Sequence, residues 1–347
     1  MKIKLPAKPA LRKKKDGVEI ARKTEKEKVD ERREEVLARG RKFKYPLQYA
    51  KHKLVINTVV IALVAVVALV LTGWAELYKF QDMGDIMYRV SSIVPLPVAE
   101  ISGERVRFSD YLMTARSSIV ALEQQSGLED LGDKKAMEEN YKRSALTQAE
   151  DLTYALKLGR ELGVEVTSEE VKKSFDDHRK VGGAERSEES FLKVLSTNFG
   201  LSKREYERML YLALMRAKVE QEIDKNALGV AAEVAKKIQE YGGDFSKVKE
   251  EMGDKVVLEG TGGLIDNKNV DGGRSGKAAT LEKGGISEQF VSTNGDGYYF
   301  VKVIDKTESQ VSYESLFVKF REFEERLKEL RESGEVKEYI KLEENQE

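Results

Sequence analysis

The chain has 347 residues, enough for two domains of ordinary size, and it contains no cysteine. Disulfide bridges, a thiolate nucleophile and cysteine-ligated metal centres are therefore excluded. The formal net charge of −1 conceals an asymmetry, because residues 1–53 hold 19 of the 60 Lys and Arg residues but 8 of the 61 Asp and Glu residues.

Residues 1–53 form a basic tail that is rich in charge and poor in aromatic residues. Such a composition buries too little apolar surface to offset the entropy of ordering, so we expect a solvated, partly helical tail. Its positive charge favours contact with anionic lipid headgroups. Binding of ribosomal RNA is an alternative without a specific motif, and we predict no nucleic-acid partner.

An uncharged apolar run follows, from Leu54 to Leu71. As a helix it rises about 27 Å, close to the hydrocarbon thickness of a bilayer. Tyr45 precedes the run, and Trp74 and Tyr78 follow it, where aromatic side chains favour the membrane interface. We predict a membrane-spanning signal anchor over residues 54–74, rather than a cleavable signal peptide or a buried core helix.

Lysines and arginines crowd only the first flank of this run, namely Arg39, Arg41, Lys42, Lys44, Lys51 and Lys53. Because basic segments resist translocation, the N-terminus is expected in the cytoplasm and everything after about Glu76 outside it. The predicted localisation is the cell membrane, with a single pass.

Residues 75–94 are predicted as a linker, and residues 95–225 as a mainly helical domain. The helical domain should open with a strand pair that turns at Gly103, followed by a helix capped by Ser109-Asp110. Apolar periodicity and capping residues predict further helices: Lys134 to Leu162, one beginning after Thr167, Ser187 to Leu195, and Ser202 to Ile223.

Residues 226–320 have a different composition and predict a small α/β domain with a four-stranded sheet. A helix ending at Gly242-Gly243 and a short second helix precede a glycine-rich passage, after which strands flank an Asn-Gly-type turn. Residues 321–347 are predicted as two helices broken near Gly334, the second over Glu335 to Glu343, packing back on the helical domain. The predicted fold class is α+β.

Several segments, in this order, resemble the SurA/PrsA/PpiD-like foldases. They are "VAEISGERVRFSDYLMTAR", "LGVEVTSEEVKKSFDD", "AEVAKKIQEYGGDFSKVKEE", "GGL", "LEKGGIS" and "GYYFVKV", spanning Pro95 to Ile304. These foldases are exported or membrane-anchored chaperones that join a SurA-like helical domain to a parvulin-type prolyl isomerase domain. The resemblance implies unfolded or nascent exported polypeptides as partners, and no cofactor.

Parvulin chemistry, as the resemblance implies it, needs a crossed pair of histidines and an apolar prolyl pocket. The histidines of this chain, His52 and His178, lie in neither required place. Tyr299 stands where one histidine belongs, and Ser315 where the other would fall if "YESLFVKF" is the family's first strand moved to the end. Without these groups we predict an inactive domain, since the barrier to prolyl rotation is lowered only by a site that stabilises the twisted imide.

Two alternatives remain open at this point. One is a divergent prolyl isomerase that uses Tyr299 and Ser315. The other is a structural or sensory envelope protein with one defined partner.

Two further patterns were weighed. Five residues at helical spacing form either core or a groove for apolar clients: Tyr206, Met209, Leu210, Leu212 and Ala213. Asn267, Asn269 and Asp271 follow calcium-loop spacing, but Ala278 replaces the glutamate that completes such a loop. We interpret that passage as a glycine-rich connector and predict no metal.

Overall fold

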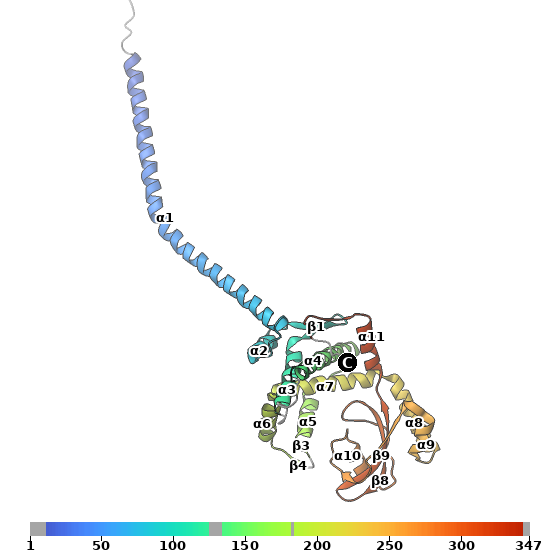
Figure 1. Ribbon diagram of the computed structural model, residues 1–347. Coiled ribbons are helices and arrows are strands. Elements are labelled where there is room, and N and C mark those ends of the chain that lie inside the picture. The colour runs from blue at the N-terminus through green and yellow to red at the C-terminus, as the bar shows by residue number, and fades with distance from the viewer. Residues whose placement is uncertain (1–11, 125–133, 182–183, 343–347) are drawn as a thin grey trace, which may run out of the picture. The chain divides into compact units, whose positions relative to one another are not determined.

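A computed structural model describes residues 12–124, 134–181 and 184–342 of the chain, apart from the side chains of residues 12–25 and 40–52. The chain divides into two compact units, Met1–Trp74 and Ala75–Glu347 (Figure 1).

The first unit is built on α1 (Arg12–Tyr78), one continuous helix. The tail is thus more helical than its composition predicts over residues 12–53, while residues 1–11 of the predicted tail lie outside the described residues. Among the described residues, the segment Lys53–Tyr78 is the part of a helix long and apolar enough to cross a membrane. By length and composition the segment is compatible with a single span.

The second unit begins inside the last turn of α1. Leu77 is fully buried in the core, and the Tyr78 hydroxyl donates a 2.6 Å hydrogen bond to the Pro97 carbonyl oxygen. A further helix, α2 (Asp85–Ile93), follows. The prediction of a linker over 75–94 is therefore wrong, because the segment forms a helix and its residues Leu77, Met83 and Met87 pack against the folded body.

The predicted strand pair is confirmed as β1 (Pro97–Ile101) and β2 (Glu104–Arg107). The turn between them places Ser102 and Gly103 at positive φ. Helix α3 (Phe108–Glu123) starts directly after β2, with Arg107 at its N-cap position. The predicted cap at Ser109-Asp110 is wrong, because both residues already lie within the helix.

The remaining helices of this part are α4 (Lys134–Leu162), α5 (Ser168–His178), α6 (Glu188–Phe199) and α7 (Lys203–Ile223), with a short hairpin of β3 (Lys180–Val181) and β4 (Ala184–Glu185). Capping boxes fix the starts of α5 and α7, where Thr167 bonds with Glu170 and Ser202 with Glu205. The capping signals at Thr167 and Ser202 are therefore confirmed.

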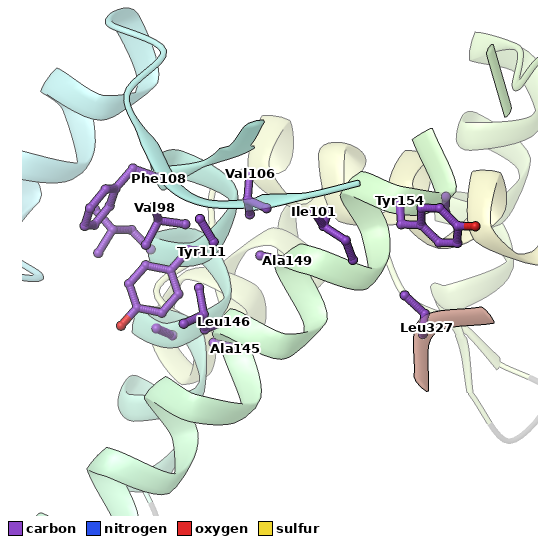
Figure 2. Packing of buried hydrophobic residues seen from close by; sticks show 14 of the residues in the cluster. Val98, Ile101, Val106, Phe108, Tyr111, Ala145, Leu146, Ala149, Tyr154 and Leu327 are labelled. Atoms are coloured by element: carbon purple, nitrogen blue, oxygen red, sulfur yellow. The ribbon is translucent and has the colours of Figure 1, made fainter. Parts of the chain in front are cut away.

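One hydrophobic cluster joins the strand pair to α3, α4, α7 and α11 (Figure 2). Phe108 and Tyr111 meet edge to face, with ring centroids 5.7 Å apart. Tyr154 of α4 lies 5.7 Å from Phe323 of α11, measured between ring centroids. We call the part of the chain around this cluster, residues 75–223 and 321–342, the helical body.

The sheet part, residues 224–320, contains α8 (Lys225–Glu240), α9 (Phe245–Met252), β5 (Val257–Gly260), β6 (Ile265–Asp266), α10 (Arg274–Ala279), β7 (Phe290–Val291), β8 (Gly297–Lys306) and β9 (Gln310–Lys319). Counted over the described residues, its antiparallel sheet has five strands in the order β5-β9-β8-β7, with β6 also paired to β9. The prediction of four strands is wrong, because the glycine-rich passage supplies β6.

The two faces of this sheet are covered by different elements (Figure 1). Because side chains alternate along a strand, Tyr298 and Phe300 of β8 pack with α8 and α9. Val301 and Val303 face the opposite side and pack with Ala278 of α10. The central strands β8 and β9 are therefore buried on both faces.

The C-terminal segment returns to the helical body. Helix α11 (Glu322–Glu332) ends before Gly334, whose φ is +74°, so the predicted break is confirmed. The predicted second helix over 335–343 is wrong: its described residues hold β10 (Val336–Glu338), antiparallel to β1, and residue 343 lies outside the described residues. The free edge of β1 decides this, because it offers backbone groups that a strand satisfies and a helix does not.

Candidate functional site

The two diverged positions, Tyr299 and Ser315, lie on one face of the sheet part. Tyr299 of β8 is paired with Phe317 of β9, and Ser315 of β9 with Val301 of β8. Paired residues point to the same face, so Tyr299 and Ser315 are diagonal neighbours on the α10 side.

Tyr299 is held by aromatic and charged neighbours. Its ring stacks on Phe317 with centroids 4.4 Å apart, and the Arg274 guanidinium lies 5.0 Å from its ring centroid. Its hydroxyl donates to Asp296 Oδ2 at 3.3 Å. Burial and, next, the Asp296 carboxylate raise the pKa of Tyr299 above its ordinary value. At neutral pH this phenol is a proton donor in a hydrogen bond and does not act as a base.

Ser315 is fully buried, and its hydroxyl has no hydrogen-bond partner among the described residues. A serine hydroxyl becomes a nucleophile or proton relay when a base accepts its proton. The strand neighbours of Ser315 are Val301 and Glu259, and neither of them accepts a hydrogen bond from its Oγ. The arrangement of Tyr299 and Ser315 therefore offers no acid–base pair.

Polar groups beside this face are engaged with each other. The Asp271 carboxylate accepts hydrogen bonds from the Tyr313 hydroxyl at 2.6 Å and from the Ser275 backbone N–H at 3.0 Å. Arg274 forms an ion pair with Glu259. Burial and the bond to Asp271 raise the pKa of Tyr313, so this phenol also stays protonated.

The three candidate metal ligands, Asn267, Asn269 and Asp271, each contact a different part of the protein. Asp271 is occupied at the start of α10, whereas the Asn267 side-chain amide donates to the Glu308 carbonyl oxygen at 3.2 Å. The Asn269 backbone N–H donates to the Asp266 carbonyl oxygen at 3.0 Å, which forms a local turn. These three residues thus make separate contacts with the protein chain.

The client-binding candidates on α7 are divided between core and surface. Leu210 packs with Phe175 and Phe191, and Leu212 packs with Met113 and Leu201. Leu210 and Leu212 are buried, Tyr206 and Met209 are half-buried, and Ala213 is exposed. The five candidates do not line one groove, and Leu210 and Leu212 serve the core.

Two hollows near apolar side chains were not identified from the sequence. One, of about 540 Å³, lies between the end of α4, residues 163–168 and α7; it is lined among others by Leu156, Val164, Val166, Tyr211 and Met215. The other, of about 460 Å³, lies between α8 and residues 286–289, with Ile238, Ile286 and Phe300 in its lining. The amphipathic pattern of α7 includes Tyr211 and Met215, but residues far away in the sequence complete the hollow.

The comparisons with known proteins concern the apolar segment of α1 and the helices that follow it, and do not extend to the sheet part. Residues 47–220, half of the chain, match the family model described as the SurA-like N-terminal domain. No match was found among curated proteins or among solved structures. The matched region contains the apolar segment of α1, the strand pair, helices α2 to α6 and most of α7. The chain therefore belongs to the SurA-like N-terminal domain family.

Proposed function

We propose that this protein is a membrane-anchored chaperone that holds unfolded exported polypeptides outside the cytoplasm and does not catalyse prolyl isomerisation. The match of residues 47–220 to the SurA-like N-terminal domain carries the proposal. The apolar segment Lys53–Tyr78 supports a single-pass anchor, and the basic flank before it supports a cytoplasmic N-terminus.

The sheet part is proposed to be a permuted, inactive parvulin-like domain. Two features support the permutation: β9 lies between β5 and β8 in the middle of the sheet, and the chain enters and leaves the domain at neighbouring residues. The absence of activity follows from Tyr299 and Ser315, which provide no base and no paired imidazoles.

Client binding is assigned to the hollow beside α7, at Val166, Tyr211 and Met215. The hollow is lined by these apolar side chains and by the polar residues Arg160, Glu165, Thr167 and Ser168. It can therefore take up an apolar side chain of an extended polypeptide next to polar backbone groups, and methionine adapts to varied shapes. Binding at such a site is weak and broad, as a holding chaperone requires.

The test of holding uses the full-length chain in lipid nanodiscs and a chemically unfolded model protein diluted into buffer. Light scattering should show suppressed aggregation of the client. Tyr211→Glu should raise the concentration needed for suppression about tenfold, because a charge would replace the aromatic side chain among the apolar lining residues. Ala213→Glu on the exposed face of the same helix is the matched control and should leave it unchanged. If both variants weakened the suppression of aggregation equally, client binding could not be assigned to this hollow.

The test of topology uses the natural absence of cysteine. Single cysteines placed at Glu31 and at Lys268 give one thiol on each side of the apolar segment. In intact spheroplasts a membrane-impermeant maleimide should label position 268 and leave position 31 unlabelled. The reverse pattern would place the body in the cytoplasm and refute an export role.

A further inference from the structure

Helix α2 presents an apolar stripe to solvent. Ile86, Val90 and Ile93 lie at positions i, i+4 and i+7, which is one face of a helix. Ile86 is 72% exposed and Ile93 is 81% exposed, while Met87, Tyr88 and Ser91 on the other side pack towards the body. An exposed apolar stripe on a helix whose other side packs on the body indicates a surface that binds another molecule or a membrane.

The stripe lies a short length of chain from the apolar segment of α1. The last turn of α1 is fixed in the body by Leu77 and by the hydrogen bond from Tyr78. Only residues 79–84 separate it from α2, which limits the separation to about 25 Å. That connector itself exposes Phe80.

A cleft rich in arginine borders the stripe. It has a volume of about 660 Å³ and shares Ile93 and Arg89 with α2. Its arginines are Arg89, Arg107, Arg116, Arg204 and Arg208, and its acidic residues are Asp85, Asp110 and Glu205.

The acidic groups in this cleft are all engaged. Arg116 forms an ion pair with Asp85, and Arg208 forms one with Asp110 at 2.9 Å. Glu205 accepts the backbone N–H of Ser202 at 2.6 Å in the capping box of α7. Arg89, Arg107 and Arg204 have no ion pair within the described part of the chain. The cleft therefore retains positive charge next to an apolar edge.

From these features we infer that α2 and the adjacent cleft form a phospholipid-binding surface, which rests on the leaflet from which α1 emerges. The stripe of Ile86, Val90 and Ile93 enters the boundary between headgroups and acyl chains. Arg89, Arg107 and Arg204 bind the lipid phosphates, since arginine pairs with phosphate through several N–H donors. Positive charge beside an apolar stripe matches a phospholipid, which carries an anionic group beside an acyl chain. This inference rests on the proposed membrane anchor.

The experiment measures membrane depth in the full-length protein. Single-cysteine variants Ile86→Cys and Ile93→Cys are labelled with an environment-sensitive fluorophore and reconstituted into vesicles of phosphatidylcholine and phosphatidylglycerol. Lipids with a spin label on the upper acyl chain serve as quenchers at the interface, and lipids with a spin label near the end of the acyl chain serve as quenchers in the bilayer centre. We expect both sites to lose about half of their fluorescence, as for a helix at the interface. Val270→Cys, at an exposed valine of the sheet part, should be unaffected.

Leu63→Cys in the apolar segment separates the two proposals, because it tests the anchor alone. Quenching at position 63, with positions 86 and 93 behaving like position 270, would overturn the lipid-binding surface and leave the anchor intact. Lack of quenching at position 63 would refute the anchor and, with it, this inference.

The arginines are tested in the Ile93→Cys background. Arg89→Gln combined with Arg204→Gln should reduce the quenching at position 93 about twofold or more in vesicles containing phosphatidylglycerol. Arg105→Gln, an exposed arginine outside the cleft, is the control and should leave it unchanged. A fluorescence response to a soluble glutamate-rich peptide, without quenching by lipid, would assign the cleft to polypeptides and overturn the lipid assignment.

Discussion

The Asp224 carboxylate accepts a 2.7 Å hydrogen bond from the backbone N–H of Arg321, 97 positions further along the chain. Its second oxygen accepts the Ala227 backbone N–H at 2.7 Å and so caps α8. One buried side chain thus joins the residue where the chain enters the sheet part to the residue where it leaves. Such a closure is what the proposed insertion and permutation of the sheet part require.

Removal of this carboxylate should loosen the sheet part. Asp224→Ala leaves the N–H groups of Ala227 and Arg321 without their partner, and we expect a loss of about 2–3 kcal/mol in the free energy of unfolding. Asp244→Ala is the matched control, because Asp244 caps α9 through a single backbone bond at a less buried site. It should cost about 1 kcal/mol. Urea unfolding of the full-length chain measures both values. If Asp224→Ala and Asp244→Ala cost the same, Asp224 would not be stabilising the junction between the first and last residues of the sheet part.

The buried carboxyl group of Glu150 should make the stability of the protein depend on pH. It is 2% exposed, its Oε1 has no hydrogen-bond partner among the described residues, and Arg331 lies 3.9 Å from its Oε2. Burial, followed by the charge of Glu338, raises the pKa of Glu150 to about 7 from its ordinary value of 4.5. Below the lower value the group is protonated in both the folded and the unfolded chain.

As the pH rises from 4.5 to about 7, the unfolded chain releases this proton while the folded chain retains it. The free energy of unfolding therefore falls across this window and is lower by a constant amount above it. Glu150→Gln should remove this loss and stabilise the protein by about 1–3 kcal/mol at pH 8, with little effect at pH 4.5. Urea unfolding at both pH values measures the difference. The exposed Glu161→Gln on the same helix should show no such difference.

The turn before β8 is docked on α7. Gly295 has φ of +72°, and a Cβ built on it would overlap the side chain of Ala217. Gly295→Ala should therefore cost about 2–4 kcal/mol, the sum of backbone strain and the steric conflict. Gly262→Ala is the control, because Gly262 also has positive φ but faces open space. Its cost should be about 1 kcal/mol.

If the contact with Ala217 causes the difference, Ala217→Gly should recover part of the loss in Gly295→Ala. The thermal midpoints of the single and double variants test this point. If Gly295→Ala lowers the thermal midpoint by the same amount in the natural chain and in the Ala217→Gly background, backbone strain alone would explain its cost.

Ser315 and Ser275 form a second matched pair, since both are fully buried serines in the sheet part. The Ser315 hydroxyl has no partner among the described residues, whereas the Ser275 hydroxyl donates to Asp271. Ser315→Ala should be neutral or stabilising by about 1 kcal/mol, and Ser275→Ala should destabilise by about 1–2 kcal/mol. Denaturant unfolding compares the two.

A prolyl isomerisation assay on the same Ser315→Ala variant, together with Tyr299→Phe, addresses the alternative of a divergent enzyme. We expect neither the natural chain nor the variants to accelerate the reaction. Activity that is lost on Ser315→Ala or Tyr299→Phe would support the divergent isomerase.

Local signals in the sequence sufficed for most of the helices. Thr167 and Ser202 cap helices through residues three positions away, so a short stretch of chain contains all the partners. The apolar segment was predictable for a similar reason, because its length and lack of charge are properties of consecutive residues. The Asn294-Gly295 turn likewise indicated two strands around it, which are β7 and β8.

The site and the closure of the domain were decided by tertiary structure. Nothing near Val336 in the sequence reveals the free edge of β1, and nothing near Asp224 reveals Arg321. The positions of Tyr299 and Ser315 could be named from the sequence, but the stacking on Phe317 and the unpartnered hydroxyl depend on strand register and burial. Secondary structure follows from neighbours along the chain, whereas protonation, edge pairing and burial depend on groups that meet only when the chain has folded.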